Sequence, residues 1–188
     1  MNKIIATLIL ALSLSPFTFA AKVADVEIPD AIKAANTELK LNGAGVRTKW
    51  FMDIYVGGLY LPQQKQNPEE IIKADEPMAI KLHMVSGLVS SDKMKKATME
   101  GFENSTHGNI DPIAEQIDEF MDIFSEEIKE NDVFDLVYQP GKGVEVYKNG
   151  TLKSTIDGGL AFKEALFGIW LSDKPAQENL KQAMLGAK

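Results

Sequence analysis

The chain has 188 residues, of which 45% are hydrophobic, and this is enough for one buried core. Its formal net charge is -7. A surface that follows nucleic-acid phosphates needs clustered Lys and Arg, so no nucleic-acid partner is expected. The sequence has no cysteine, which excludes disulfides and lipid attachment through a cysteine.

The first twenty residues have the pattern of a secretory signal. Lys3 supplies a positive start, Ile4–Leu14 is an apolar run, and Thr18–Ala20 has small residues at the two cleavage positions. The run is far shorter than the roughly 20 residues of a membrane-spanning helix. We therefore expect a signal peptide at 1–20 and a single domain at 21–188. The mature chain would be exported to a bacterial periplasm, with no integral membrane segment.

Three strands are predicted in the first half of that domain. Leu39 and Leu41 alternate with polar residues, and the run 50–61 is rich in aromatic and branched residues, which favours two neighbouring strands. Residues 78–85 form the third, with one apolar face made by Met78, Ile80, Leu82 and Met84.

Helices are predicted between and after the strands. Residues 68–74 can form a short helix, and Ser90 is a good cap for a helix that ends near Ser105. A strongly amphipathic helix is expected from Asp111, with Pro112 in its first turn, to about Ile128.

The last third should hold a small antiparallel sheet followed by two helices. Asn149-Gly150 has the composition of a type I′ hairpin turn. The expected strands are 133–138, 143–148 and 151–156, and the expected helices are 160–171, buried on most sides, and 175–186. Strands that group early and late favour an α+β fold over a doubly wound parallel sheet.

Arg47 is the most informative single residue. If the strand stays extended, alternation places it on one face with Leu39, Leu41, Gly43 and Gly45. The glycines of this strand and the next would then leave open volume beside the arginine, or else mark bulges. An inward arginine needs an anion, because burying an unpaired charge is costly. That anion is either an internal carboxylate or a ligand. The candidate internal carboxylates are those of Asp53, Glu100 and Asp157.

Three stretches resemble the chalcone isomerase-like family. "LNGAGVRTKWFMDIYVGGLYL" is similar to the family's Gly-x-Gly-x-Arg segment and the strand after it. "IDEFMDIFSEEIKENDVFDLVY" resembles its amphipathic helix and following strand, and "GGLAFKEALFGIWLSDKPAQENLKQAMLG" its C-terminal helices. The resemblance covers about 25–186 and is strongest to an exported bacterial branch.

The resemblance implies an open-faced antiparallel β-sheet packed against a layer of α-helices, with a ligand cleft between them. Plant members are isomerases that close a ring by adding a phenolate to an enone, and other members bind fatty acids. In both groups, the arginine that matches Arg47 meets an oxygen that is negative or becomes negative, which agrees with an inward cation.

The remainder of the isomerase site is poorly matched. Tyr55 stands where the isomerases have a threonine, and Lys93, Lys96 and Glu100 stand where they have tyrosine, lysine and asparagine. Ile169 replaces a further polar position. Stabilising an enolate takes several convergent polar groups, whereas binding a carboxylate takes one cation and an apolar cleft.

The preferred hypothesis is therefore a non-catalytic domain that binds a fatty acid or similar lipophilic carboxylate, with Arg47 as anchor and Tyr55 beside it. Candidate cleft residues are Phe162, Leu166, Ile169, Trp170, Phe51, Met84 and Met94. One alternative is an isomerase or lyase that uses Arg47, Tyr55 and Lys96 on an enone or polyphenol-like substrate. Another is a protein-interaction module in which Arg47 is satisfied internally.

No cofactor or metal is expected. His83 and His107 are the only histidines, and no metal-ligand spacing joins them. The sequence leaves the oligomeric state open.

Overall fold

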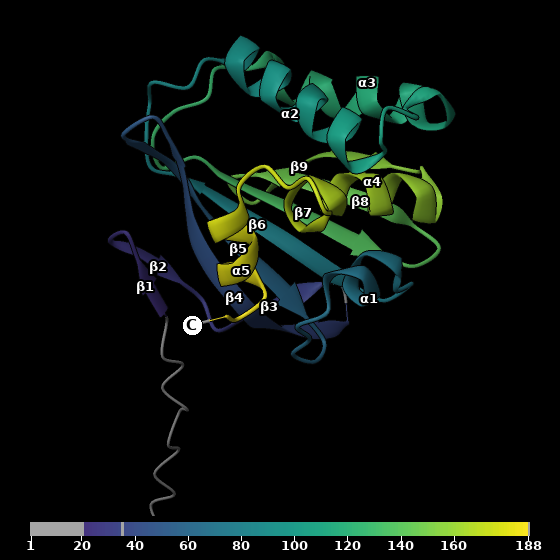
Figure 1. Cartoon of the computed structure of the whole chain (residues 1–188), viewed down its shortest axis with the longest axis horizontal. Helices are drawn as coiled ribbons and strands as arrows, with labels where there is room; N and C mark the ends of the chain where they lie inside the picture. The colour runs from purple at the N-terminus through teal and green to yellow at the C-terminus, as the bar shows by residue number, and fades with distance from the viewer. Residues whose placement is uncertain (1–20, 35, 188) are drawn as a thin grey trace, which may run out of the picture.

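The computed structural model of the chain describes residues 21–34 and 36–187. Seven strands form one antiparallel sheet in which spatial order follows chain order (Figure 1). They are β3 (Ala31–Ala34), β4 (Thr37–Lys49), β5 (Met52–Leu61), β6 (Met78–Met84), β7 (Val133–Gln139), β8 (Gly143–Lys148) and β9 (Thr151–Ile156). A separate hairpin consists of β1 (Ala21–Val23) and β2 (Val26–Ile28). The predicted signal at 1–20 lies outside the described residues.

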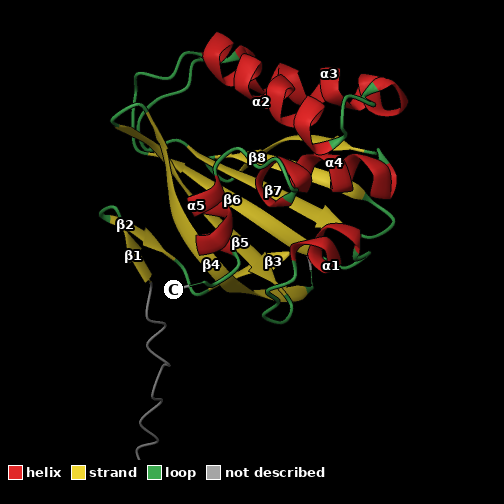
Figure 2. Ribbon diagram, in the orientation of Figure 1, coloured by secondary structure: helices red, strands yellow, loops and turns green. Residues whose placement is uncertain are grey.

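Five helices accompany this sheet, and Figure 2 shows them gathered on one side of the strands, away from the β1–β2 hairpin. They are α1 (Pro68–Lys73), α2 (Ser91–Ser105), α3 (Ala114–Asp122), α4 (Gly159–Leu171) and α5 (Glu178–Met184). Short 3-10 turns at Asp111–Ile113 and Ile123–Ser125 flank α3. The predicted α+β class is thus confirmed. Within the described part of the chain, no helix is long and apolar enough to cross a membrane.

The two faces of the sheet bury separate cores. The core between the sheet and the helices contains the predicted apolar side chains of β6 and most side chains of α4. A cluster of phenylalanines joins α2, α3 and α4 to it, and the ring centroids of Phe102 and Phe162 are 5.8 Å apart. The opposite face carries Leu39, Val56 and Tyr60, which the β1–β2 hairpin covers with Val26 and Ile28.

The segment around α3 departs from the sequence prediction. A continuous helix to Ile128 was expected, but α3 ends at Asp122 and Glu126 is extended. The carbonyl of Glu126 accepts a hydrogen bond from Ser91 Oγ, and that of Glu127 accepts one from Lys148 Nζ. These side chains donate the hydrogen bonds that backbone N–H groups would donate to the two carbonyls in a helix. Ile128 is buried although it is not helical.

A β-bulge at Asn42 corrects the predicted face of β4. Leu41 pairs with Tyr60, but Gly43 pairs with Leu59, so the strand gains one unpaired residue between them. One extra residue turns every later side chain to the other face. Leu39 and Leu41 therefore face the β1–β2 hairpin, and the prediction that they share a face with Gly43 and Arg47 was wrong.

Candidate functional site

Arg47 lies directly opposite Tyr55 in the ladder between β4 and β5. Tyr55 is buried in the core that faces the helices, and its hydroxyl accepts a hydrogen bond of 2.9 Å from Trp170 Nε1 of α4. Arg47 itself is half-buried. Two adjacent strands and the end of α4 thus bring a guanidinium, a phenol and an indole N–H together.

Gln177, which precedes α5, holds the arginine in place. Its Oε1 accepts hydrogen bonds from Arg47 Nη1 at 3.0 Å and from the backbone N–H of Thr48 at 2.9 Å. Its Nε2 donates to the carbonyl of Val46. A second register shift lies between Arg47 and Thr48, so this amide satisfies backbone groups that the bulge leaves outside the ladder.

The partners of Arg47 are all neutral. Besides Gln177, Nη1 donates to the carbonyl of Thr48 at 3.3 Å, and Arg47 lies near enough to the Tyr55 hydroxyl to act on the pKa of that phenol. Among the described residues no carboxylate forms an ion pair with Arg47, so the internal salt bridge with Asp53, Glu100 or Asp157 is absent there. Asp53 instead accepts a hydrogen bond from Thr48 Oγ1. A guanidinium carries five N–H donors, so Arg47 keeps donors for a further acceptor.

Burial raises the pKa of Tyr55 above its usual value, because the phenolate would lose its hydration. The hydrogen bond from Trp170 and the nearby charge of Arg47 act in the opposite direction but do not reverse the shift. Tyr55 is therefore a neutral phenol at physiological pH. Its oxygen already accepts from Trp170, which leaves its own O–H available as a donor.

The glycines near Arg47 do not enclose open volume, so the first of the two expected alternatives is wrong, whereas the second is met because both strands contain a bulge. A Cβ on Gly43 would lie 2.1 Å from the carbonyl oxygen of Ala183, and one on Gly45 would lie 2.6 Å from Ala183 Cβ. A Cβ on Gly57 would lie 2.7 Å from Met184 Cε. These glycines let α5 approach the sheet closely.

Asn42 fixes the other end of α5. Its Nδ2 donates to the carbonyls of Met184 and Lys65, and its Oδ1 accepts from the backbone N–H of Lys65. Asn42 and Gln177 therefore tie both ends of α5 to β4, one at the bulge at Asn42 and the other beside the register shift that leaves Ile54 of β5 unpaired. The position of this helix, and with it Gln177, determines the environment of Arg47.

The other predicted site residues fall into two groups. The first group is buried in the core, and this burial agrees equally with a cleft lining and with a plain core. Its members are Phe162, Leu166, Ile169, Met84 and Met94. Phe162 lies about 12 Å from Trp170 along α4, and Ile169 packs against Gly101 of α2. The expectation that Phe51 lines a cleft was wrong, because it is 99% exposed at the β4–β5 turn.

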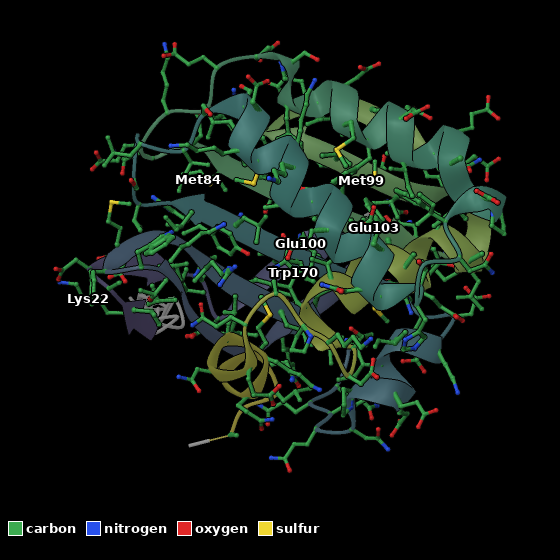
Figure 3. The ribbon with its side chains drawn as sticks, turned by 45° about the horizontal axis from the view of Figure 1, so that its top comes forward. Lys22, Met84, Met99, Glu100, Glu103 and Trp170 are labelled. Atoms are coloured by element: carbon green, nitrogen blue, oxygen red, sulfur yellow. The ribbon has the colours of Figure 1, made fainter. Side chains whose placement is uncertain are left out.

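Lys93, Lys96 and Glu100 lie on α2 and are all exposed. The buried stripe of α2 consists of Met94, Thr98, Gly101 and Phe102, which turns these charges away from the core. Figure 3 shows Glu100 and Glu103 on α2, which packs on α4, the helix of Trp170. In the part of the chain that the structure describes, no hydrogen bond or ion pair links these three residues to Arg47, so the polar set of the isomerases is not assembled around it.

Sequence reasoning missed Gln177 and the second bulge, at Ile54 of β5 opposite Arg47 and Thr48. A glutamine before a short helix is not a strong capping signal, and it would have been found only by knowing that α5 packs on β4. The glycines at 43, 45 and 57 were the available signal, since several glycines on adjacent strands indicate the close approach of another element.

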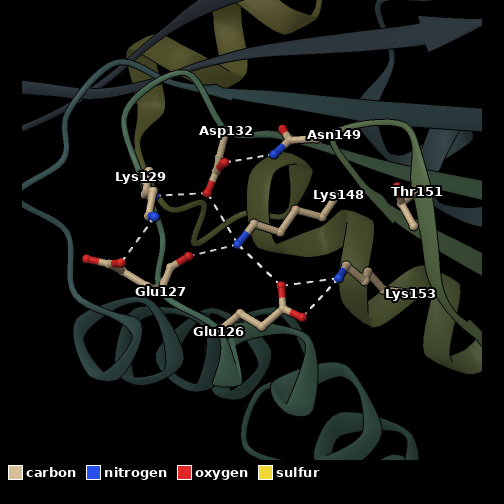
Figure 4. Close-up of a pocket in the computed structure, with 8 residues that line it drawn as sticks. All are labelled: Glu126, Glu127, Lys129, Asp132, Lys148, Asn149, Thr151 and Lys153. Atoms are coloured by element: carbon tan, nitrogen blue, oxygen red, sulfur yellow. Dashed lines mark hydrogen bonds and ion pairs between the residues drawn. The ribbon is translucent and has the colours of Figure 1, made fainter.

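A surface hollow of about 530 Å³ lies elsewhere, around Lys148. Figure 4 shows its ion pairs and hydrogen bonds, which join the hollow's own residues. Lys148 Nζ lies 3.3 Å from Asp132 Oδ2 and donates to the carbonyl of Glu127, while Lys153 pairs with Glu126. The charges there are satisfied within the chain. In the described ranges, no group of His, Asp and Glu side chains is placed to hold a metal ion.

The fold and this site define an α+β protein with a curled antiparallel sheet and helices on one face. Arg47 lies where β4 meets the start of α5. A family model described as "Chalcone isomerase-like" matches residues 20–186, and the chain belongs to that family. A solved structure of similar fold is that of a fatty-acid binding protein from Arabidopsis thaliana. The TM-score is 0.67 at 16% sequence identity, and the match covers 88% of this chain and 95% of that one. Curated proteins give no significant match.

Proposed function

We propose that this protein binds a fatty acid or a similar lipophilic carboxylate without transforming it, and that Arg47 is the anion anchor. The chain would do so as an exported protein, in a bacterial periplasm. The family supports a ligand of this class, since a protein of the same fold carries the description fatty-acid binding protein.

The observation that carries the proposal is a half-buried guanidinium whose contacts are neutral. A ligand carboxylate would supply the missing charge, and charge-assisted hydrogen bonds are about twice as strong as neutral ones. The Tyr55 hydroxyl, which accepts from Trp170, keeps its proton for one carboxylate oxygen while Arg47 donates to the other. Trp170 would then act by orienting Tyr55.

The hydrocarbon tail would extend into the apolar core beside these groups. Met84 pairs with Tyr55 in the ladder between β5 and β6, Met184 lies over Gly57, and Met94 and Ile169 are buried in the same core. Methionine is unbranched and fills irregular spaces adaptably, so a methionine-rich lining can rearrange around a chain at low cost. Met184 belongs to α5, and binding would move its side chain from its place over Gly57.

The test is a direct titration of the mature protein with a fluorescent fatty acid such as cis-parinaric acid. We expect Arg47→Met to weaken binding by about 10- to 100-fold, as expected for the loss of about 1.5–3 kcal/mol from a charge-assisted hydrogen bond. Lys49→Met is the matched control, because it removes one positive charge from an exposed position two residues away. It should change affinity less than about twofold.

Extraction of protein purified from its native host gives an independent readout. Fatty acids identified by mass spectrometry in the wild type and lost in Arg47→Met would support the proposal. Absence of bound acid from both, together with equal titration curves for both, would overturn it. Turnover of 2′-hydroxychalcone by the wild type would favour an isomerase instead.

A further inference from the structure

The turn between β4 and β5 exposes an unusual amount of apolar surface. Trp50 and Phe51 form the turn and are 83% and 99% exposed, and Met52 beside them is 42% exposed. Soluble proteins expose single apolar side chains routinely, but adjacent large ones commonly mark a contact surface.

Leu88 extends this surface from a second loop. It is 66% exposed in the segment that joins β6 to α2. The backbone N–H of Val85, at the start of that segment, donates to the carbonyl of Ile54, three residues after Phe51 at the turn end of the hairpin. Figure 1 shows the hairpin end and this loop at the same end of the molecule, at the upper left. We call Trp50, Phe51, Met52 and Leu88 the tip patch.

The conformation of the hairpin turn does not favour the large apolar residues that occupy it. Trp50 has a φ of 63°, whereas Phe51 is not among the residues with positive φ, and this is the sign pattern of a type II′ turn. Glycine is the usual residue at the first position of that turn, because a side chain there is strained. A tryptophan thus occupies an unfavourable backbone position while its side chain stays in solvent.

We propose that the tip patch inserts into the interfacial layer of a lipid bilayer. The exposed area of Trp50, Phe51 and Met52 is roughly 400–500 Å², estimated from about 150–250 Å² per large side chain, well below the ~800 Å² per partner of a stable protein interface. A bilayer sets no such minimum, since lipids surround a protruding turn. Tryptophan is also enriched at the headgroup level of membranes.

The driving force is apolar burial and not charge. The chain has a formal net charge of -7, so an anionic membrane surface would not attract it as a whole. Lys49 is the only cation within the turn's immediate sequence, and Asp53 offsets it. Binding should therefore occur on zwitterionic lipid and depend little on salt.

Docking at this tip would also bring the Arg47 site to the membrane. Arg47 precedes Trp50 by three residues, or about 10 Å along an extended strand. A tip inserted among the lipids would leave Arg47 near the headgroups, where the carboxylate of a membrane-dissolved fatty acid lies. This last step rests on the proposed function, whereas docking itself does not.

The experiment is flotation of the mature protein with phosphatidylcholine vesicles at low and high salt, compared with a double variant, Trp50→Gly and Phe51→Ser. Glycine suits the positive φ, so the variant should melt no lower than the wild type. We expect its vesicle-bound fraction to fall at least tenfold. Leu152→Ser, which removes a 48%-exposed leucine from β9, is the matched control and should bind like the wild type.

In the wild type, brominated lipids should quench the fluorescence of Trp50, which is exposed, and leave that of buried Trp170 largely unchanged. Wild-type protein that stays in solution, or a double variant that floats equally well, would overturn the proposal. Self-association of the wild type through the tip without vesicle binding would overturn it too. Arg47→Met should float normally, so failure of ligand binding and failure of docking are separable.

Discussion

The hollow around Lys148 holds a buried cation and the site around Arg47 a half-buried one, and the two differ in what surrounds the charge. Lys148 has a side chain only 8% exposed, and it lies within 3.7 Å of carboxylate oxygens of Asp132 and Glu126. Arg47 meets an amide oxygen and a backbone carbonyl. The first cation is neutralised by the chain, and the second is held in position without being neutralised.

Lys163 sharpens this comparison, because it is a buried cation that forms no ion pair with any described residue and yet has no N–H donor left for a ligand. Its Nζ donates to the carbonyls of Ile71, Ile72 and Ala74 at the end of α1, which uses its three N–H groups. Arg47 has five N–H donors, and its hydrogen bonds to Gln177 and Thr48 both come from Nη1. A missing carboxylate therefore indicates a ligand site only where donors also remain.

The largest expected effect is on stability at Lys148. Lys148→Met should lower the free energy of unfolding by about 3 kcal/mol, because it leaves the buried carboxylate of Asp132 without its cation. Urea unfolding at neutral pH measures this. Lys153→Met is the control, since it removes a more exposed partner of Glu126 and should cost less than about 1 kcal/mol. Equal losses in the two variants would contradict the account.

Gly43→Ala should come next, with a loss of about 2–3 kcal/mol from overpacking. The added Cβ would meet the carbonyl oxygens of Ala183 and Met184 at 2.1 and 2.9 Å, so α5 must move away from β4. Because Gln177 moves with α5, fatty-acid affinity should fall as well. Gly87→Ala, where the nearest atom is 3.7 Å away, should leave both unchanged. A stable Gly43→Ala with wild-type affinity would show that α5 does not organise the site.

Local patterns predicted most elements of the fold well. The alternation of Met78 to Met84 placed one face of β6 in the core, Ser90 caps α2, and Asn149-Gly150 forms the turn between β8 and β9 with positive φ at both residues. Each of these depends on interactions within a few residues, which is why the sequence alone suffices. The three short strands before β4 lacked a strong alternating pattern and were missed.

The site itself was only partly predictable. The resemblance singled out Arg47 and Tyr55, Trp170 was one of the candidate cleft residues, and the fold brings the three together. Alternation could not reveal the bulge at Asn42, because one unpaired residue changes the facing of a strand without changing its composition. Trp50 and Phe51 continued the apolar run of β5, so a turn there had no local signal. Gln177 depends on contacts 129 to 131 residues apart along the chain.

Lys163 gives a pH-dependent effect of about 2 kcal/mol. Burial lowers the pKa of Lys163 to about 8, below its usual value near 10.4. Between these values the unfolded chain binds more protons, so the stability of the wild type rises with pH relative to Lys163→Met. The free energy of unfolding of the wild type minus that of Lys163→Met should increase by about 2 kcal/mol from pH 7 to 9.5. A difference that stays constant or shrinks would show that the ammonium is not destabilised by burial.

The smallest expected effect on stability is at Arg47, and it bears most directly on function. Arg47→Met removes two hydrogen bonds but leaves no carboxylate unpaired, so the free energy of unfolding should change by less than about 1 kcal/mol. Thermal and urea unfolding of the ligand-free protein measure it, with Lys148→Met as the opposite case. A loss as large as that of Lys148→Met would make Arg47 a structural cation and remove the main support for an anion anchor. A small loss in stability together with a large loss in fatty-acid affinity would separate the two roles, because a cation that the fold does not need is then required only by the ligand.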